Sequence, residues 1–187
     1  MPARRLPLYQ AVDREIDAFQ QATGLGCPTG CGHCCETQTP FVSVADMGPI
    51  AAAVVARGDG EMLYDRAVAA GDAGGPCAIF QPGRLPGGCT EYELRPMLCR
   101  LFGFAAVRDK HRQPHLALCR IHARDVPEAA ARATAFVDGG GAVPLFADWQ
   151  AEADALDPDG SREQLPINVA LARALERELL RARYAGT

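Results

Sequence analysis

The chain has 187 residues, of which 48% are hydrophobic and 22% are charged, and its formal net charge is −4. This composition is typical of a globular protein of about one domain. An acidic chain without a basic stripe is a poor general nucleic-acid binder. The apolar run 50–56 is far shorter than the roughly 20 residues that a membrane span needs. We therefore expect neither a nucleic-acid partner nor a membrane partner.

The N-terminal segment contains two arginines, Arg4 and Arg5, but no apolar stretch follows them. A secretory signal needs such a stretch, of about 7–15 residues, so we expect a cytoplasmic protein. Thiols in a reducing compartment are more often metal ligands or catalytic groups than disulfides. This expectation guides the interpretation of the cysteines.

Hydrophobic periodicity predicts helices along most of the chain. Apolar residues recur at helical spacing from Leu8 to Phe19, and Ser43 to Asp46 has the form of a capping box before an alanine-rich segment. Glycine or proline bounds most of these segments. We expect helices over about 8–23, 44–57, 61–70, 127–137 and 146–156, and a final helix that has Pro166 in its first turn.

Between these helices, residues 24–35 and 74–89 are rich in glycine, proline and cysteine and show no period. This composition predicts loops whose shape does not depend on a hydrophobic core. The apolar run 101–107 is expected to be a buried strand or an extended segment. The predicted fold is mainly α, a small single domain with irregular metal-organised loops. Within it we expect a cysteine-cluster metal-binding domain over residues 1–125 and, over residues 126–187, a helical C-terminal extension that packs on it.

All eight cysteines lie between positions 27 and 119 and avoid the helical stripes. Cysteines that serve only as small core hydrophobes would be scattered over those stripes. The first four form Cys-x3-Cys-x2-Cys-Cys, a spacing at which a turning backbone can aim successive thiolates at one point. The predicted metal ligands are Cys27, Cys31, Cys34, Cys35, Cys77, Cys89, Cys99 and Cys119.

The spacing leaves the identity of the metal open. Zinc suits tetrahedral thiolate sites, often built from two Cys-x2-Cys pairs, whereas one tight cluster with dispersed cysteines is closer to an iron–sulfur site such as [4Fe–4S]. Cys27, Cys31 and Cys34 also have the spacing of radical S-adenosylmethionine enzymes, but the strand–helix alternation of their barrel is absent. Adjacent Cys34 and Cys35 point in different directions. They can therefore serve two metals, or one of them is not a ligand.

Two further motifs are PCAIF at 76–80 and GCTEYELRPMLCRLF at 88–102. Together with the cysteine cluster they resemble the YkgJ family of cysteine-cluster proteins, which is described as zinc- or iron-chelating. The resemblance covers about residues 27–119 and implies metal chelation by the matching cysteines. A similar cluster occurs in flagellin lysine-N-methylases, which are linked to iron–sulfur clusters. Gly103 departs from the family, because many relatives have a proline after the phenylalanine.

Arginines and histidines accompany the cysteines. A four-thiolate zinc site or a [4Fe–4S] core carries about two net negative charges, which Arg95 and Arg100 are predicted to neutralise while donating hydrogen bonds to sulfur. The alternative is ordinary ion pairs with carboxylates such as Glu91, Glu93 or Asp109. The four histidines, His33, His111, His115 and His122, are expected to be solvated side chains. The alternatives are that His33 replaces a thiolate of the first cluster, and that His111, His115 and His122, which flank Cys119, form a third metal position.

Three functions remain open on the sequence. The first is a metal-binding protein that stores or inserts metal or uses it for structure and for contact with a protein partner. The second is an iron–sulfur enzyme of redox or methyl-transfer type. The third is a thiol redox protein in which adjacent Cys34 and Cys35 act as a switch.

Overall fold

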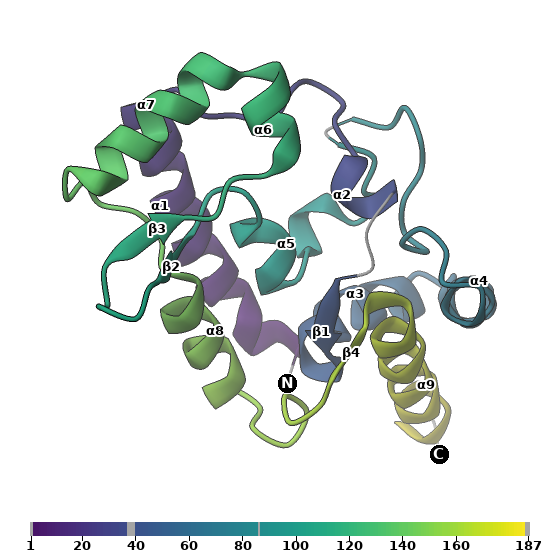
Figure 1. Ribbon diagram of the computed structural model, residues 1–187. Helices are drawn as coiled ribbons and strands as arrows, with labels where there is room; N and C mark the ends of the chain where they lie inside the picture. Colours follow the sequence, from purple (N-terminus) through teal and green to yellow (C-terminus); the bar gives the residue numbers. More distant parts are fainter. Residues whose placement is uncertain (1, 37–39, 86, 186–187) are drawn as a thin grey trace. The chain divides into compact units, whose positions relative to one another are not determined.

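The computed structural model describes residues 2–36, 40–85 and 87–185 (Figure 1). These residues form nine α-helices, two short 3-10 helices and two antiparallel strand pairs, which confirms the mainly α fold class. The α-helices are α1 (Leu6–Thr23), α2 (His33–Glu36), α3 (Val44–Ala56), α4 (Gly60–Asp72), α5 (Met97–Leu101), α6 (Arg120–Asp125), α7 (Pro127–Asp138), α8 (Phe146–Ala155) and α9 (Ile167–Ala185). The 3-10 helices are η1 (Pro2–Arg5) and η2 (Tyr92–Leu94). Over the described ranges, none of the helices combines the length and the apolar character that crossing a membrane would require.

The strands are three residues each. β1 (Phe41–Ser43) pairs with β4 (Gln164–Pro166), and Val42 lies opposite Leu165. β2 (Ala106–Arg108) pairs with β3 (Pro114–Leu116), and Val107 lies opposite His115. The first pair joins segments that are far apart in the sequence, and the second pair is a hairpin.

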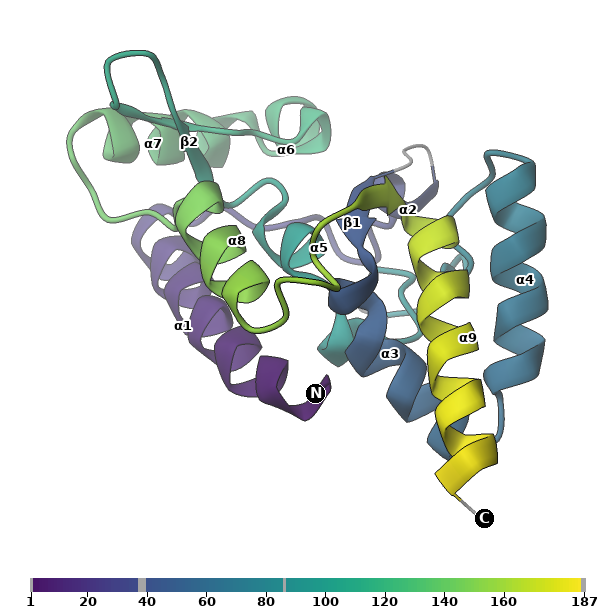
Figure 2. The ribbon, with the colours of Figure 1, turned by 90° about the horizontal axis from the view of Figure 1, so that it is seen from below.

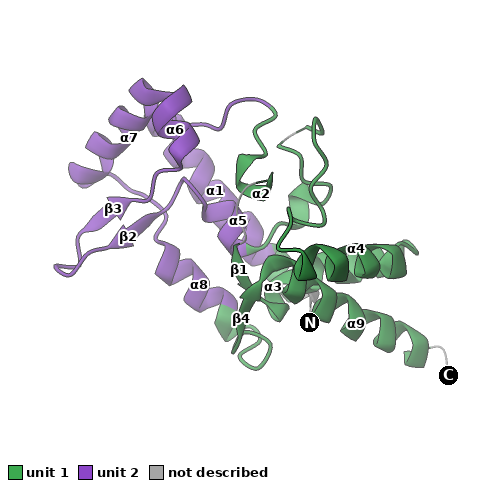
Figure 3. Cartoon of the chain, turned by 45° about the vertical axis from the view of Figure 1, so that its right-hand side comes forward, with its two compact units in different colours: residues 1–6, 30–96, 154–187 green, residues 7–29, 97–153 purple. Residues whose placement is uncertain are grey.

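The chain divides into two compact units (Figure 3). Unit 1 comprises residues 1–6, 30–96 and 154–187, and unit 2 comprises residues 7–29 and 97–153. The division at residue 125 that the sequence suggested stays a prediction. Because each unit has its own core, we describe them separately.

In unit 1, α3, α4 and α9 pack side by side (Figure 2). Ile50 and Val54 of α3 and Leu171 and Leu175 of α9 are fully buried, as expected of apolar residues at helical spacing. The capping box at the start of α3 is confirmed, because the Asp46 amide donates to the Ser43 hydroxyl and the Ser43 amide donates to the Asp46 carboxylate.

In unit 2, the apolar face of α1 contributes to two hydrophobic clusters. Tyr9, Val12 and Ile16 pack with Met97 and Leu101. The second cluster joins the end of α1 to α7 and contains Phe19, Leu25, Ala106, Ala129, Ala130, Ala133 and Val137. Both ends of the helix are thereby fixed within the unit.

The predicted long helices agree with α1, α3, α4, α7, α8 and α9 to within a few residues. The prediction of a strand or extended segment over residues 101–107 was only partly right. The segment begins with the last residue of α5, and β2 starts at Ala106. Pro166 does not lie in the first turn of α9; it ends β4 directly before that helix. The restricted backbone of proline suits either position, so the sequence alone did not distinguish them.

Candidate metal centre

Five of the eight cysteines lie in unit 1, on two segments that lie against each other. Cys31, Cys34 and Cys35 belong to the loop and short helix 31–36, and the amide of Cys77 donates to the carbonyl of Cys35 at 3.0 Å. A bridge between Phe80 and Cys89 holds the second segment as a tight turn. The backbone contacts therefore bring the two halves of the cysteine motif together.

Glycine permits the close approach of these two segments. Gly87 has φ +95°, and a Cβ added there would lie 2.9 Å from the carbonyl oxygen of Cys31. A side chain at this position would be strained and would collide with backbone. Glycine is thus required where the 74–89 loop meets the cysteine cluster.

The thiols of unit 1 differ sharply in their acidity. Cys34 Sγ lies 3.9 Å from Cys35 Sγ, and this contact lowers the pKa of Cys34 to about 6, with a smaller contribution from the charge of Arg95. Burial raises the pKa of Cys77 to about 12, and the charges of Cys89 and Cys34 add to the rise. Burial also raises the pKa of Cys89. A bound cation would favour the thiolate form of all of these groups.

The two arginines occupy different surroundings. The Arg95 guanidinium lies 3.5 Å from the centre of the Tyr92 ring, and its charge lowers the pKa of both Cys34 and Cys89. It therefore acts on the thiols electrostatically. Arg100, which is buried in unit 2, pairs with Asp13 and lies 4.4 Å from the centre of the Tyr9 ring. The predicted cofactor-binding role of both arginines stays a prediction.

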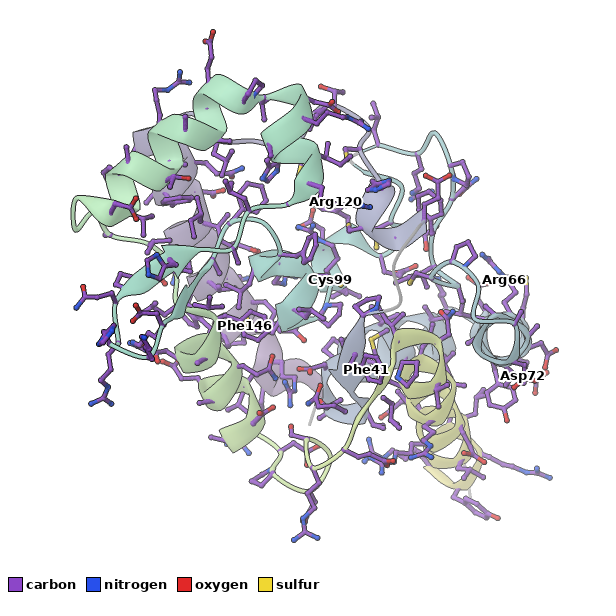
Figure 4. All side chains as sticks on the ribbon, viewed as in Figure 1. Phe41, Arg66, Asp72, Cys99, Arg120 and Phe146 are labelled. Atoms are coloured by element: carbon purple, nitrogen blue, oxygen red, sulfur yellow. The ribbon has the colours of Figure 1, made fainter. Side chains whose placement is uncertain are left out.

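The other three cysteines lie in unit 2. Cys99 lies on α5, and Cys119 is the residue before α6; Figure 4 labels Cys99 and also Arg120, which follows Cys119. Cys27 is exposed, and its Sγ lies 3.3 Å from Nε2 of His122. None of the eight cysteines, all of which lie in the described ranges, forms a disulfide.

The expectation that His122 is a solvated side chain was wrong. His122 is 0% exposed, packs against the Phe104 ring and has a pKa that burial lowers. His111 and His115 are exposed, as predicted, and His33 is half-buried. The Cys119-x2-His122 spacing was the signal that could have identified His122, since the residue that caps a helix lies close to the third residue of that helix.

No group of three or more Cys, His, Asp or Glu side chains is gathered closely enough to hold a metal ion within residues 2–36, 40–85 and 87–185. The Cys34–Cys35 and Cys27–His122 contacts nevertheless bring donors together in pairs. Thiols with a buried imidazole are a donor set that suits zinc or an iron–sulfur cluster. The residues present therefore fit either group in the type of donor that they supply.

Comparison with known proteins points in the same direction. A family model with the motif name CxxCxxCC, described as a "putative zinc- or iron-chelating domain", matches residues 26–120. That range contains all eight cysteines and ends before His122. Searches of the curated proteins and of the solved structures gave no match.

Proposed function

The chain belongs to the CxxCxxCC family of zinc- or iron-chelating domains, and from this premise we propose that its cysteine thiolates hold zinc or a [4Fe–4S] cluster in a reducing, cytoplasmic compartment. The observation that carries the proposal is the meeting of the two cysteine segments of unit 1, joined by the Cys77–Cys35 backbone hydrogen bond. We propose all eight cysteines as ligands. Those of unit 1 are Cys31, Cys34, Cys35, Cys77 and Cys89, and those of unit 2 are Cys27, Cys99 and Cys119.

Charge supports a metal at the cysteines of unit 1. Several thiolates close together repel one another, and the raised pKa of Cys77 reflects both this repulsion and burial. A cation removes the repulsion and displaces the protons. Arg95 offsets the remaining negative charge, because it already favours the thiolates of Cys34 and Cys89.

We propose a metal-holding role ahead of catalysis, because the chain supplies eight thiols as ligands. A catalytic metal site needs an open coordination position beside a substrate pocket. One small cavity of unit 1 is lined mainly by α3, α9 and the segment before β4, including Val44, Asp157 and Ala174, and none of the eight cysteines lines it. The iron–sulfur enzyme remains the alternative that the Cys-x3-Cys-x2-Cys spacing favours.

The proposal is tested by replacing Cys77 and a matched neighbour. Cys77→Ser is expected to lower the metal content of protein purified without oxygen, because a buried hydroxyl is a poor ligand for zinc or iron–sulfur iron. Ala78→Ser, at the adjacent residue with the same 5% exposure, adds the same side chain without removing a thiol. The metal content of Ala78→Ser should match wild type, and equal metal content in both variants would exclude Cys77 as a ligand.

A further inference from the structure

We propose that His122 supplies an imidazole nitrogen to a metal site in unit 2, together with the thiolates of Cys27 and Cys119. This inference rests on the proposed metal-binding function and adds a donor that lies outside the family match at residues 26–120. Three independent features of unit 2 support it: the contact of His122 with sulfur, the surroundings of its other nitrogen, and its spacing from Cys119.

The contact with sulfur has the geometry of two ligands of one metal. Nε2 of His122 lies 3.3 Å from Sγ of Cys27. Two donors of a tetrahedral zinc, with bonds of about 2.3 Å to sulfur and about 2.0–2.1 Å to nitrogen, lie about 3.5 Å apart. Because Cys27 is exposed, a metal can reach this pair without the unit unfolding.

The other ring nitrogen is buried beside backbone. Nδ1 of His122 has no partner within hydrogen-bonding geometry, although the side chain is completely buried. This nitrogen lies next to Gly103, and the ring fits there because glycine has no side chain. A Cβ added at Gly103 would lie 2.9 Å from Cε1 and 3.3 Å from Nδ1 of the ring. A metal at Nε2 would leave the ring proton on Nδ1, where the backbone of Gly103 is the adjacent group; ligating histidines commonly direct their second nitrogen at a backbone carbonyl.

Cys119 is held beside the same ring. Cys119 is the residue before α6, and its side chain makes no capping hydrogen bond. A Cβ added at Gly103 would lie 3.2 Å from the Cβ of Cys119, as well as 2.9 Å from Cε1 of His122. Cys119 and His122 are three residues apart, a spacing that lets two side chains chelate one ion. Cys99 of α5 is the cysteine of unit 2 that remains to complete a Cys3His set.

The test is zinc binding to the metal-free full-length chain, followed by X-ray absorption at the zinc edge. Wild type is expected to show sulfur scatterers at about 2.3 Å and a nitrogen scatterer at about 2.0–2.1 Å. His122→Ala should lose the nitrogen signal and bind less zinc. The control His115→Ala, which removes an exposed histidine of the same unit, should retain both.

A second variant guards against a simple loss of folding, since His122 is fully buried. His122→Cys should bind as much zinc as wild type, with sulfur scatterers at about 2.3 Å and no nitrogen signal. If wild type binds zinc through sulfur alone, or if the nitrogen signal persists in both His122 variants, the inference is wrong and the proposed function stands. If wild type binds no zinc and no iron, the proposed function fails with it.

Discussion

At the scale of single residues, Cys34 and Cys77 show how position controls a thiol. Both belong to the cysteine motifs, yet the Cys35 contact and Arg95 favour the thiolate of Cys34 while burial favours the neutral thiol of Cys77. Sequence spacing identified both residues. It could not rank them, because acidity depends on burial and on side-chain contacts that exist only in the folded chain.

This difference predicts the order of alkylation in metal-free protein. The thiolate is the reactive form, so at neutral pH Cys34 should react with iodoacetamide at least about tenfold faster than Cys77. As the pH falls through about 6, Cys34 becomes protonated and its rate should drop. Peptide mass spectrometry after timed quenching measures both rates, and comparable rates at the two cysteines would refute the assignment.

Gly103 is the family departure that the structure explains. Its φ of +84° cannot be adopted by proline, whose φ is fixed near about −65°, so the proline of other family members cannot replace it with this backbone. The absent side chain leaves room for His122 and Cys119.

Replacing Gly103 separates backbone strain from steric conflict. Gly140 has the same φ of +84° but no atom within 4 Å of an added Cβ. Gly140→Ala should therefore lower the free energy of unfolding by about 1 kcal/mol from backbone strain alone. Gly103→Ala should cost at least about 2 kcal/mol, because it also collides with the His122 ring. Urea unfolding measures both, and equal losses would contradict the packing described for His122.

At the scale of elements, the start of α3 depends on a buried ion pair. Arg5 and Asp46 are 2% and 1% exposed and lie 2.7 Å apart, and Arg5 also donates to Ser161 at 3.2 Å. The sequence predicted the capping box at Ser43 and Asp46 but not the arginine. The reason is that 41 residues separate the two charges and no local pattern links them.

Breaking this pair is expected to be costly. Arg5→Met removes the guanidinium that pairs with the buried Asp46 carboxylate, so the free energy of unfolding should fall by about 3–5 kcal/mol. Arg173→Met removes the cation of an exposed pair with Glu163 and should cost less than about 1 kcal/mol. Denaturant midpoints of the two variants test the contrast; a similar small loss in both would show that the burial of Arg5 does not contribute as described.

Helix length determined which elements the sequence could predict. The helices of ten residues or more were anticipated, because several turns display an apolar face. The short helices α2, α5 and α6 were not, since one turn carries no measurable period and such helices depend on tertiary packing. These same short helices carry or adjoin Cys34, Cys99 and Cys119, so the least predictable elements bear the candidate ligands.

At the scale of the whole molecule, α9 joins the C-terminal end of the chain to residues 44–78 within unit 1. It packs on α3 and α4, and the side chain of Asn168 accepts from the Ala78 amide at 2.8 Å. The last helix thereby supports the loop that carries Cys77. Metal chelation could be predicted from cysteine spacing, whereas the support of Cys77 by Asn168 and the burial of His122 arise only from tertiary contacts.

Metal binding by the cysteines is tested by measuring the metal, sulfide and free-thiol content of wild-type protein purified without oxygen. If the cysteines bind metal, the protein will contain stoichiometric zinc, or iron with acid-labile sulfide, and its thiols will resist titration until the metal is removed. A folded, metal-free protein in which all eight thiols titrate freely would contradict it.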